Sequence, residues 1–219
     1  MGEDAILAGA NTFAIGDGST DLWEIIQAGD VTPLGDGQFR LGKLLRGQAG
    51  SCGLMPDTWP VGSKIVLLDG SLQQLDLAAA SRGTTRHFRF GPASQLMSHT
   101  SYRYATHAFA GNGLRPYPVT HLRAVGAVDL QIDWIRQTRI DGDDWSGLDV
   151  PLGEDSETYL LEIIQSGNVR RTVILTSPSY AYLAADRLSE TAGDAFTASV
   201  AQVSERYGVV PAQTIEVGA

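Results

Sequence analysis

Cysteine is nearly absent from this sequence of 219 residues. Cys52 stands alone, so no disulfide can form within the chain and no metal site can be built from several thiolates. Long apolar runs are missing as well, because the best of them, such as residues 64–70, are far too short to span a bilayer. The first residues lack the basic and apolar regions of a signal peptide. We therefore expect a soluble protein that is made in the cytoplasm and does not insert into a membrane.

Basic side chains are scarce in the second half of the chain. Residues 1–125 hold ten acidic and ten basic side chains, whereas residues 126–219 hold fifteen acidic and six basic ones. The second half thus carries a net charge of −9, which equals that of the whole chain. Nucleic-acid binding needs clustered Lys and Arg, so no nucleic-acid partner is expected. We also expect that contact between this acidic half and an anionic cell surface needs divalent cations.

Motifs that carry catalysis or hold cofactors are missing too. The sequence contains no Gly-x-Ser-x-Gly turn, no phosphate-binding loop and no His-Glu-x-x-His pair. The four histidines show no metal-ligand spacing, and Cys52 has no evident base partner. Two distant carboxylates that converge in space, as in a glycosidase, are an alternative that the sequence leaves open. We predict no catalytic residues, no metal and no cofactor.

Glycine, in contrast, is abundant. The 25 glycines and nine prolines are scattered between short apolar runs, which is typical of an all-β protein with many turns. The difference in net charge between the two halves and a proline-containing connector at residues 111–122 predict two domains. We predict a β-rich domain over residues 1–125 and a β-sandwich of immunoglobulin-like size over residues 126–219.

The stretch Ile132–Trp145, which reads IDWIRQTRIDGDDW, decides whether the second domain carries a special site. Trp134 shares the apolar register of its strand with Leu130 and Ile132, so it is predicted to be a core anchor. The acidic run from Asp141 lacks the ligand spacing of an EF-hand calcium loop. We interpret the stretch as a strand, a turn and a second strand. Trp23 is predicted to be a core anchor of the first domain.

Separated motifs, which follow one another in a fixed order, resemble a known family. They are Trp23–Glu24, Ile26–Gln27, Leu44–Gly50, Arg115–Leu122 and Trp134–Arg139. Together they resemble the C-terminal region of the tail-tip hub proteins of gene transfer agents and of related long-tailed, siphovirus-like phages of alphaproteobacteria. The resemblance covers nearly the whole chain. It implies that residues 126–219 form a fibronectin type III-like domain, in which the core anchor Phe196 stands where a tyrosine often lies.

The same resemblance implies a function. It implies a structural component of a phage or phage-like tail tip, assembled with hub and baseplate proteins at the distal tail end of the virion, in contact with the host surface and as a homotrimer. Family hubs are longer chains, and Met1 stands just ahead of what resembles an internal segment. We therefore expect a partner chain, whether this is one part of a split hub or a separate subunit.

Two alternatives remain from the sequence. A carbohydrate- or receptor-binding module of the tail tip would use exposed aromatic side chains, for which Trp145, Tyr180 and Tyr182 are the candidates, with Trp59 as a further one. An enzyme acting on the cell wall or capsule is the other alternative. Because no catalytic motif is present, we predict that the chain is not an enzyme.

Overall fold

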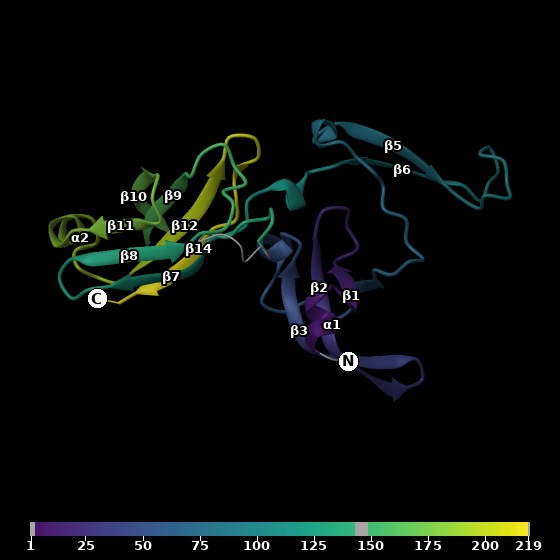
Figure 1. Cartoon of the computed structure of the whole chain (residues 1–219), viewed down its shortest axis with the longest axis horizontal. Coiled ribbons are helices and arrows are strands. Elements are labelled where there is room, and N and C mark those ends of the chain that lie inside the picture. The colour runs from purple at the N-terminus through teal and green to yellow at the C-terminus, as the bar shows by residue number, and fades with distance from the viewer. Residues whose placement is uncertain (1–2, 143–148, 219) are drawn as a thin grey trace. The chain divides into compact units, whose positions relative to one another are not determined.

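The chain forms two compact units in a computed structural model that describes residues 3–142 and 149–218. The units are Met1–Leu114, the N-terminal unit, and Arg115–Ala219, the C-terminal unit. Both are built mainly from antiparallel strands, which confirms the predicted all-β class (Figure 1). None of the helices in the described part of the chain has the length and apolar character needed to cross a membrane.

The N-terminal unit holds one four-stranded sheet and one separate two-stranded hairpin. Its elements are α1 (Glu3–Leu7), β1 (Thr12–Gly16), β2 (Trp23–Gly35), β3 (Gln38–Gln48), η1 (Ser51–Leu54), β4 (Lys64–Leu67), η2 (Ala79–Ser81), β5 (Thr85–Phe90), β6 (Arg103–Ala108) and η3 (Asn112–Leu114). The strand order of the sheet is β3-β2-β1-β4, and β5 pairs with β6.

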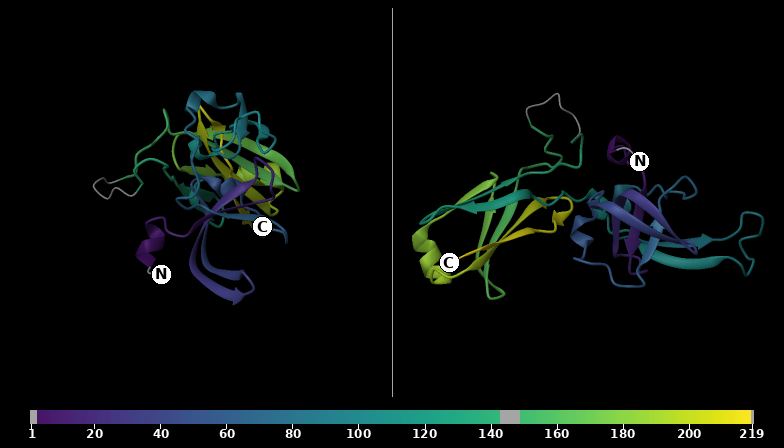
Figure 2. Two further views of the ribbon diagram at one scale, coloured as in Figure 1. Left: turned by 90° about the vertical axis from the view of Figure 1, so that its right-hand side faces the viewer. Right: turned by 90° about the horizontal axis from the view of Figure 1, so that it is seen from below.

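A two-residue turn connects β2 and β3. Asp36 and Gly37 both have positive φ angles, 50° and 73°, which is the type I′ geometry that matches the twist of the flanking strands. The Asp-Gly pair is typical of this turn. Because β1 pairs only with residues 23–27 of β2, the far half of the β2–β3 hairpin extends beyond the rest of its sheet (Figures 1 and 2).

The C-terminal unit is a sandwich of two antiparallel sheets. Its elements are β7 (Thr120–Val125), β8 (Leu130–Ile135), β9 (Tyr159–Gln165), β10 (Asn168–Leu175), β11 (Ser179–Tyr182), α2 (Ala184–Thr191), β12 (Phe196–Ser204), β13 (Gly208–Val209) and β14 (Gln213–Val217). One sheet has the order β11-β8-β7, and the other has β10-β9-β12, with β13 and β14 both paired to β12. This arrangement is that of a fibronectin type III-like sandwich, as predicted.

Alternating apolar side chains fill the space between the two sheets. Leu130, Ile132 and Trp134 of β8 are buried, and their neighbours along the strand are not. The Trp134 ring meets the Tyr159 ring edge-on, with 5.1 Å between the ring centroids. Phe196 packs in the same way against Tyr182, at 5.5 Å. The structure thus places Trp134 and Phe196 in the core.

The boundary between the units lies earlier than the sequence suggested. We assigned residues 1–125 to the first domain, but β7 is the first strand of the sandwich and pairs with β8. Val119 and Leu122, which lie in and beside β7, belong to the sandwich core. The prolines that precede β7 made this segment resemble a connector. The division therefore falls between Leu114 and Arg115.

The stretch Ile132–Trp145 is a strand that leads into an irregular loop. β8 ends at Ile135, and neither residues 136–142 nor residues 149–158 form a strand, so the predicted second strand is not found in the described part of this segment. Arg136 donates hydrogen bonds to the carbonyls of Val150 and Pro151, at 2.9 and 2.8 Å. These bonds replace the ladder that a second strand would have provided.

We predict that Phe196→Ala destabilises the C-terminal unit by about 3–5 kcal/mol, because it leaves a cavity between two packed sheets. Amide hydrogen exchange in β9 and β12 of the full chain measures the effect. Val169→Ala on β10, where the side chain is 51% exposed, is the matched control and is expected to cost less than about 1 kcal/mol. Unchanged exchange in β9 of the Phe196 variant would contradict the placement of this ring.

Candidate functional site

A fully buried carboxylate anchors the N-terminal unit. Glu24, the second residue of β2, has an exposed fraction of 0%. The Nε and Nη2 atoms of Arg46 donate to its two carboxylate oxygens at 3.0 and 2.8 Å. The backbone N–H of Gly47 donates at 3.0 Å, and the indole N–H of Trp59 donates at 2.6 Å. Four donors thus satisfy the two oxygens.

The local sequence explains how these donors reach Glu24. Gly47 has a φ of 63°, and a Cβ atom at this position would lie 2.9 Å from the Cβ of Cys52. A glycine here lets the chain turn tightly after β3 and bring its backbone N–H to the carboxylate. Arg46 also donates to the carbonyls of Pro56 and Asp57, at 2.8 and 3.0 Å. The ion pair therefore fastens the loop that precedes β4 to the sheet.

The pKa of Glu24 lies below its ordinary value of 4.5. Burial alone raises it, but the hydrogen bonds from Arg46, Trp59 and Gly47 outweigh burial and stabilise the ionised form. With every lone-pair direction occupied, the carboxylate has no position left from which to exchange a proton with a ligand. The arrangement makes Glu24 a structural anchor of the unit.

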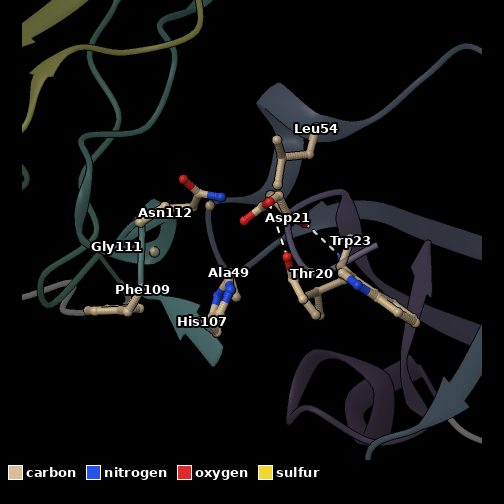
Figure 3. Close-up of a pocket in the computed structure, with 14 residues that line it drawn as sticks. Thr20, Asp21, Trp23, Ala49, Leu54, His107, Phe109, Gly111 and Asn112 are labelled. Carbon is tan, nitrogen blue, oxygen red and sulfur yellow. Dashed lines mark hydrogen bonds between the residues drawn. The ribbon is translucent and has the colours of Figure 1, made fainter. Parts of the chain in front are cut away.

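A pocket of about 260 Å³ is lined by Trp23 and Ile25, the two chain neighbours of Glu24 (Figure 3). Its polar lining residues are Thr20, Asp21, Ser51, His107 and Asn112, and its larger apolar ones are Trp23, Ile25, Leu54 and Phe109. The segment before β2 supplies one wall, and the end of β6 with η3 supplies another. The pocket offers hydrogen-bonding groups beside aromatic rings, a combination suited to holding a small polar ligand.

Ser51 fixes the floor of this pocket. The backbone N–H of Ile25 donates to the Ser51 hydroxyl at 2.8 Å, and this hydroxyl donates to the carbonyl of Gln48 at 2.7 Å. Cys52 follows in η1, and burial raises the pKa of its thiol, which therefore stays protonated at neutral pH. In the described residues, no three His, Cys, Asp or Glu side chains come together as metal ligands would.

An apolar groove lies on the sheet of the N-terminal unit. It has a volume of about 570 Å³ and is lined by Asn11, Phe13, Val31, Gly37, Phe39, Leu41, Ile65 and Leu67. The strand registers explain why these side chains share one face: Phe13 lies opposite Leu67, and Val31 lies opposite Leu41. Phe39, at the far end of the hairpin, is 62% exposed. The face is thus apolar and open.

The aromatic candidates for a glycan platform do not form one in the described structure. Tyr182 is fully buried, so the prediction that it contacts a ligand at the surface is wrong. Its hydroxyl donates to Glu190 at 2.9 Å, and its ring packs against Phe196. Tyr180 is half-buried, and its hydroxyl accepts a hydrogen bond from Arg171 at 2.6 Å. Trp145 lies outside the described residues.

Two further tryptophans differ from their expected roles. Trp23 is only half-buried; its indole N–H donates to the Ser19 carbonyl at 2.6 Å, and its ring lines the pocket, so it is not a deeply buried core anchor. Trp59 is half-buried, and its indole N–H donates to Glu24, so the polar edge of its ring is already occupied. The sequence analysis missed Glu24 as a key residue. Its position in register with Ile26 and Ala28, both buried, was the available signal.

Comparisons with known proteins concern mainly the start of the chain. A model of the family described as Rcc01698-like, C-terminal, matches residues 1–66, and Rcc01698 is a gene transfer agent-associated protein. No curated protein sequence matches the chain. Among solved structures, domains d3–d4 of the rat CD45 extracellular region match with 10% identity, coverage of 94% of each chain and a TM-score of 0.35.

We predict that Arg46→Met destabilises the N-terminal unit by about 3–5 kcal/mol, because the Glu24 carboxylate is left buried without its partner. Hydrogen exchange of β2 amides measures the effect. In the native protein the pKa of Glu24 is lowered, so its stabilising contribution is present above pH 4.5 and is lost as the pH falls through the folded-state pKa. In the variant only Trp59 and Gly47 still oppose the effect of burial on the pKa of Glu24, so this acid-induced loss should become smaller.

A surface ion pair provides the control for this prediction. Lys43 and Asp30 lie 3.7 Å apart with side chains 72% and 51% exposed, so Lys43→Met is expected to cost less than about 1 kcal/mol. The double variant Glu24→Gln with Arg46→Met is expected to recover much of the loss, since it buries no charge. Equal losses of stability in Lys43→Met and Arg46→Met would contradict the prediction that the buried Glu24–Arg46 pair stabilises the unit more than a surface ion pair does.

Proposed function

We propose that this chain is a structural component of a phage or phage-like tail tip, which assembles through its N-terminal unit with hub or baseplate proteins at the distal end of the tail. The observation that carries the proposal is the open apolar face of the N-terminal sheet. Large contiguous apolar surfaces of this kind mark sites of protein–protein contact. A subunit whose sheet is covered only by its neighbours is what an assembled particle requires.

The edges of the sheet support the same proposal. β4 pairs with β1 on one side, and in the described residues no strand pairs with its other side. All four of its residues, Lys64–Leu67, are exposed. Free backbone N–H and C=O groups along an apolar edge are a template for a strand from another chain. The N-terminal sheet is therefore suited to extension by a partner.

The family match supports the kind of particle. Residues 1–66 contain β1, β2, β3 and most of β4, which together make this sheet. The part of the chain that is similar to a gene transfer agent-associated family is thus the part that carries the open face. A homotrimeric state, a place at the distal tip and contact with the host surface are further parts of the proposal, and they rest on the resemblance of the sequence motifs.

Gold-labelled antibody against residues 126–219, viewed on intact particles by electron microscopy, tests the location. We expect label at the end of the tail distal to the capsid. Particles that stay unlabelled, both intact and after detergent opening, would contradict a place in the particle. The glycan-binding alternative would then become the leading hypothesis for a free protein.

We predict that Phe39→Ser prevents incorporation of the chain into particles, because it removes a large apolar side chain from the open face. The fold should change little, since this side chain is 62% exposed. Ile174→Ser on β10, where the side chain is 61% exposed, is the matched control in the C-terminal unit. Quantitative immunoblots of purified particles give the comparison. Equal incorporation of both variants would show that the open face does not mediate assembly.

A further inference from the structure

The middle of the chain is strongly basic although the protein is acidic. Residues 77–128 contain no Asp or Glu, and they hold six arginines and all four histidines. The other ten of the sixteen basic side chains and all twenty-five acidic ones lie outside this segment. The segment includes the whole β5–β6 hairpin. A concentration of one charge sign in a molecule of opposite net charge points to a specific anionic partner.

The β5–β6 hairpin presents this charge on exposed strands. β5 and β6 pair only with each other among the described strands. Arg89 lies opposite Tyr104, and Phe90 lies opposite Arg103, so each face of the hairpin carries one arginine beside one aromatic ring near the tip. Phe90 is 56% exposed. Neither Arg89 nor Arg103 forms a salt bridge with a described residue.

Backbone hydrogen bonds fold the loop at the tip of the hairpin. Three successive turns close with backbone hydrogen bonds from Gln95 to Pro92, from His99 to Leu96, and from Tyr102 to His99. The Tyr102 hydroxyl also donates to the Pro92 carbonyl at 3.2 Å.

These turns direct two large apolar side chains outward. Leu96 is 80% exposed and Met97 is 61% exposed. More than half of each residue is therefore open to solvent, although the loop that holds them is fixed by its own hydrogen bonds. The apolar tip is therefore a defined surface feature of the hairpin.

We propose that the β5–β6 hairpin is an arm that docks on the surface of an anionic lipid bilayer. Leu96 and Met97 enter the headgroup region, where apolar side chains are removed from water. Arg89 and Arg103 lie one step behind them and bind lipid phosphates, and the neighbouring aromatic rings lie at the interface between the two.

The order of chemistry along the hairpin favours a bilayer over nucleic acid. In a nucleic acid, an apolar tip ahead of the arginines could enter only between base steps, which costs a few kcal/mol for unstacking each step. A leaflet offers both in the observed order, with phosphates outside and acyl chains inside. The docking is peripheral, since a tip of two apolar side chains reaches only the headgroup region.

This inference does not depend on the proposed function. The arm requires only an anionic bilayer, whereas the open apolar face of the N-terminal sheet requires a protein partner. A chain that binds vesicles and is missing from particles would retain the arm and lose the tail-tip role. A chain that is labelled at the tail tip and fails to bind vesicles would keep the tail-tip role and contradict the arm.

Sedimentation of the full chain with unilamellar vesicles tests the arm. One set of vesicles is pure phosphatidylcholine, and in the other phosphatidylglycerol replaces part of it. We expect binding to the anionic vesicles that falls as salt is added. Arg89→Gln with Arg103→Gln should weaken this binding about thirty-fold, since each arginine near an anionic leaflet contributes roughly five-fold. Leu96→Ser with Met97→Ser should weaken it at least about ten-fold.

A matched control separates the arm from net charge. Arg40→Gln with Arg170→Gln makes the same change in net charge at two exposed positions, on β3 and β10, outside the arm. Binding of this control should stay within about three-fold of the native chain, because both arginines lie outside the arm that contacts the leaflet. Hydrogen exchange in β2 and β9 reports that each variant keeps both units folded.

Three results would overturn the proposal. The first is an absence of binding to anionic vesicles at low salt. The second is an equal loss of binding in the arm variant and in the control, which would make the attraction a matter of net charge. The third is tight binding of short duplex DNA that displaces the vesicles and is lost in the arginine variant, which would assign the arm to nucleic acid.

Discussion

The charge of Glu24 is the constraint on which the N-terminal unit depends. A carboxylate placed in the buried register of β2 must find donors, because an unpaired buried charge costs more than a small sheet can offset. These donors come from Arg46 on β3, from the tight turn at Gly47 and from Trp59 in the loop before β4. The segment after β3 must therefore fold back over β2. This course of the chain positions η1, which forms part of one wall of the neighbouring pocket.

The two units solve the problem of burial in different ways. The C-terminal unit closes two sheets on a shared apolar core, in which Trp134, Tyr159 and Phe196 interlock edge-on. In the N-terminal unit, the fully or nearly buried apolar side chains of the described residues are few, chiefly Ile26 and Ala28 of β2. Its sheet relies on an ion pair for internal order and leaves an apolar face open. The first design suits a self-sufficient domain, and the second suits a part of an assembly.

Local patterns account for the fold class and for several turns, but they do not determine which distant segments come into contact. The turns at Asp36-Gly37 and Ser166-Gly167 follow from residue types that accept positive φ angles. The buried register of β8 follows from simple alternation around Trp134. The burial of Tyr182 did not follow, because it depends on Glu190 in α2 and on the facing strand that starts at Phe196.

The pocket and the pairing around Glu24 escaped prediction for the same reason, since their parts come from segments far apart in the sequence. β7 was assigned to the wrong domain because the prolines before it outweighed a short alternation in six residues.

The open sheet of the N-terminal unit also affects how the chain behaves during its synthesis. During synthesis it emerges ahead of the 105 residues of the C-terminal unit, a delay of roughly 5–20 s at ribosomal rates. Pro33 and Lys43 disfavour pairing of the β2–β3 hairpin with a strand of another chain. At the apolar edge strand β4, Lys64 is the one residue of this kind. Production of this chain must therefore be matched to the supply of whatever covers that edge, and a surplus made alone is expected to aggregate.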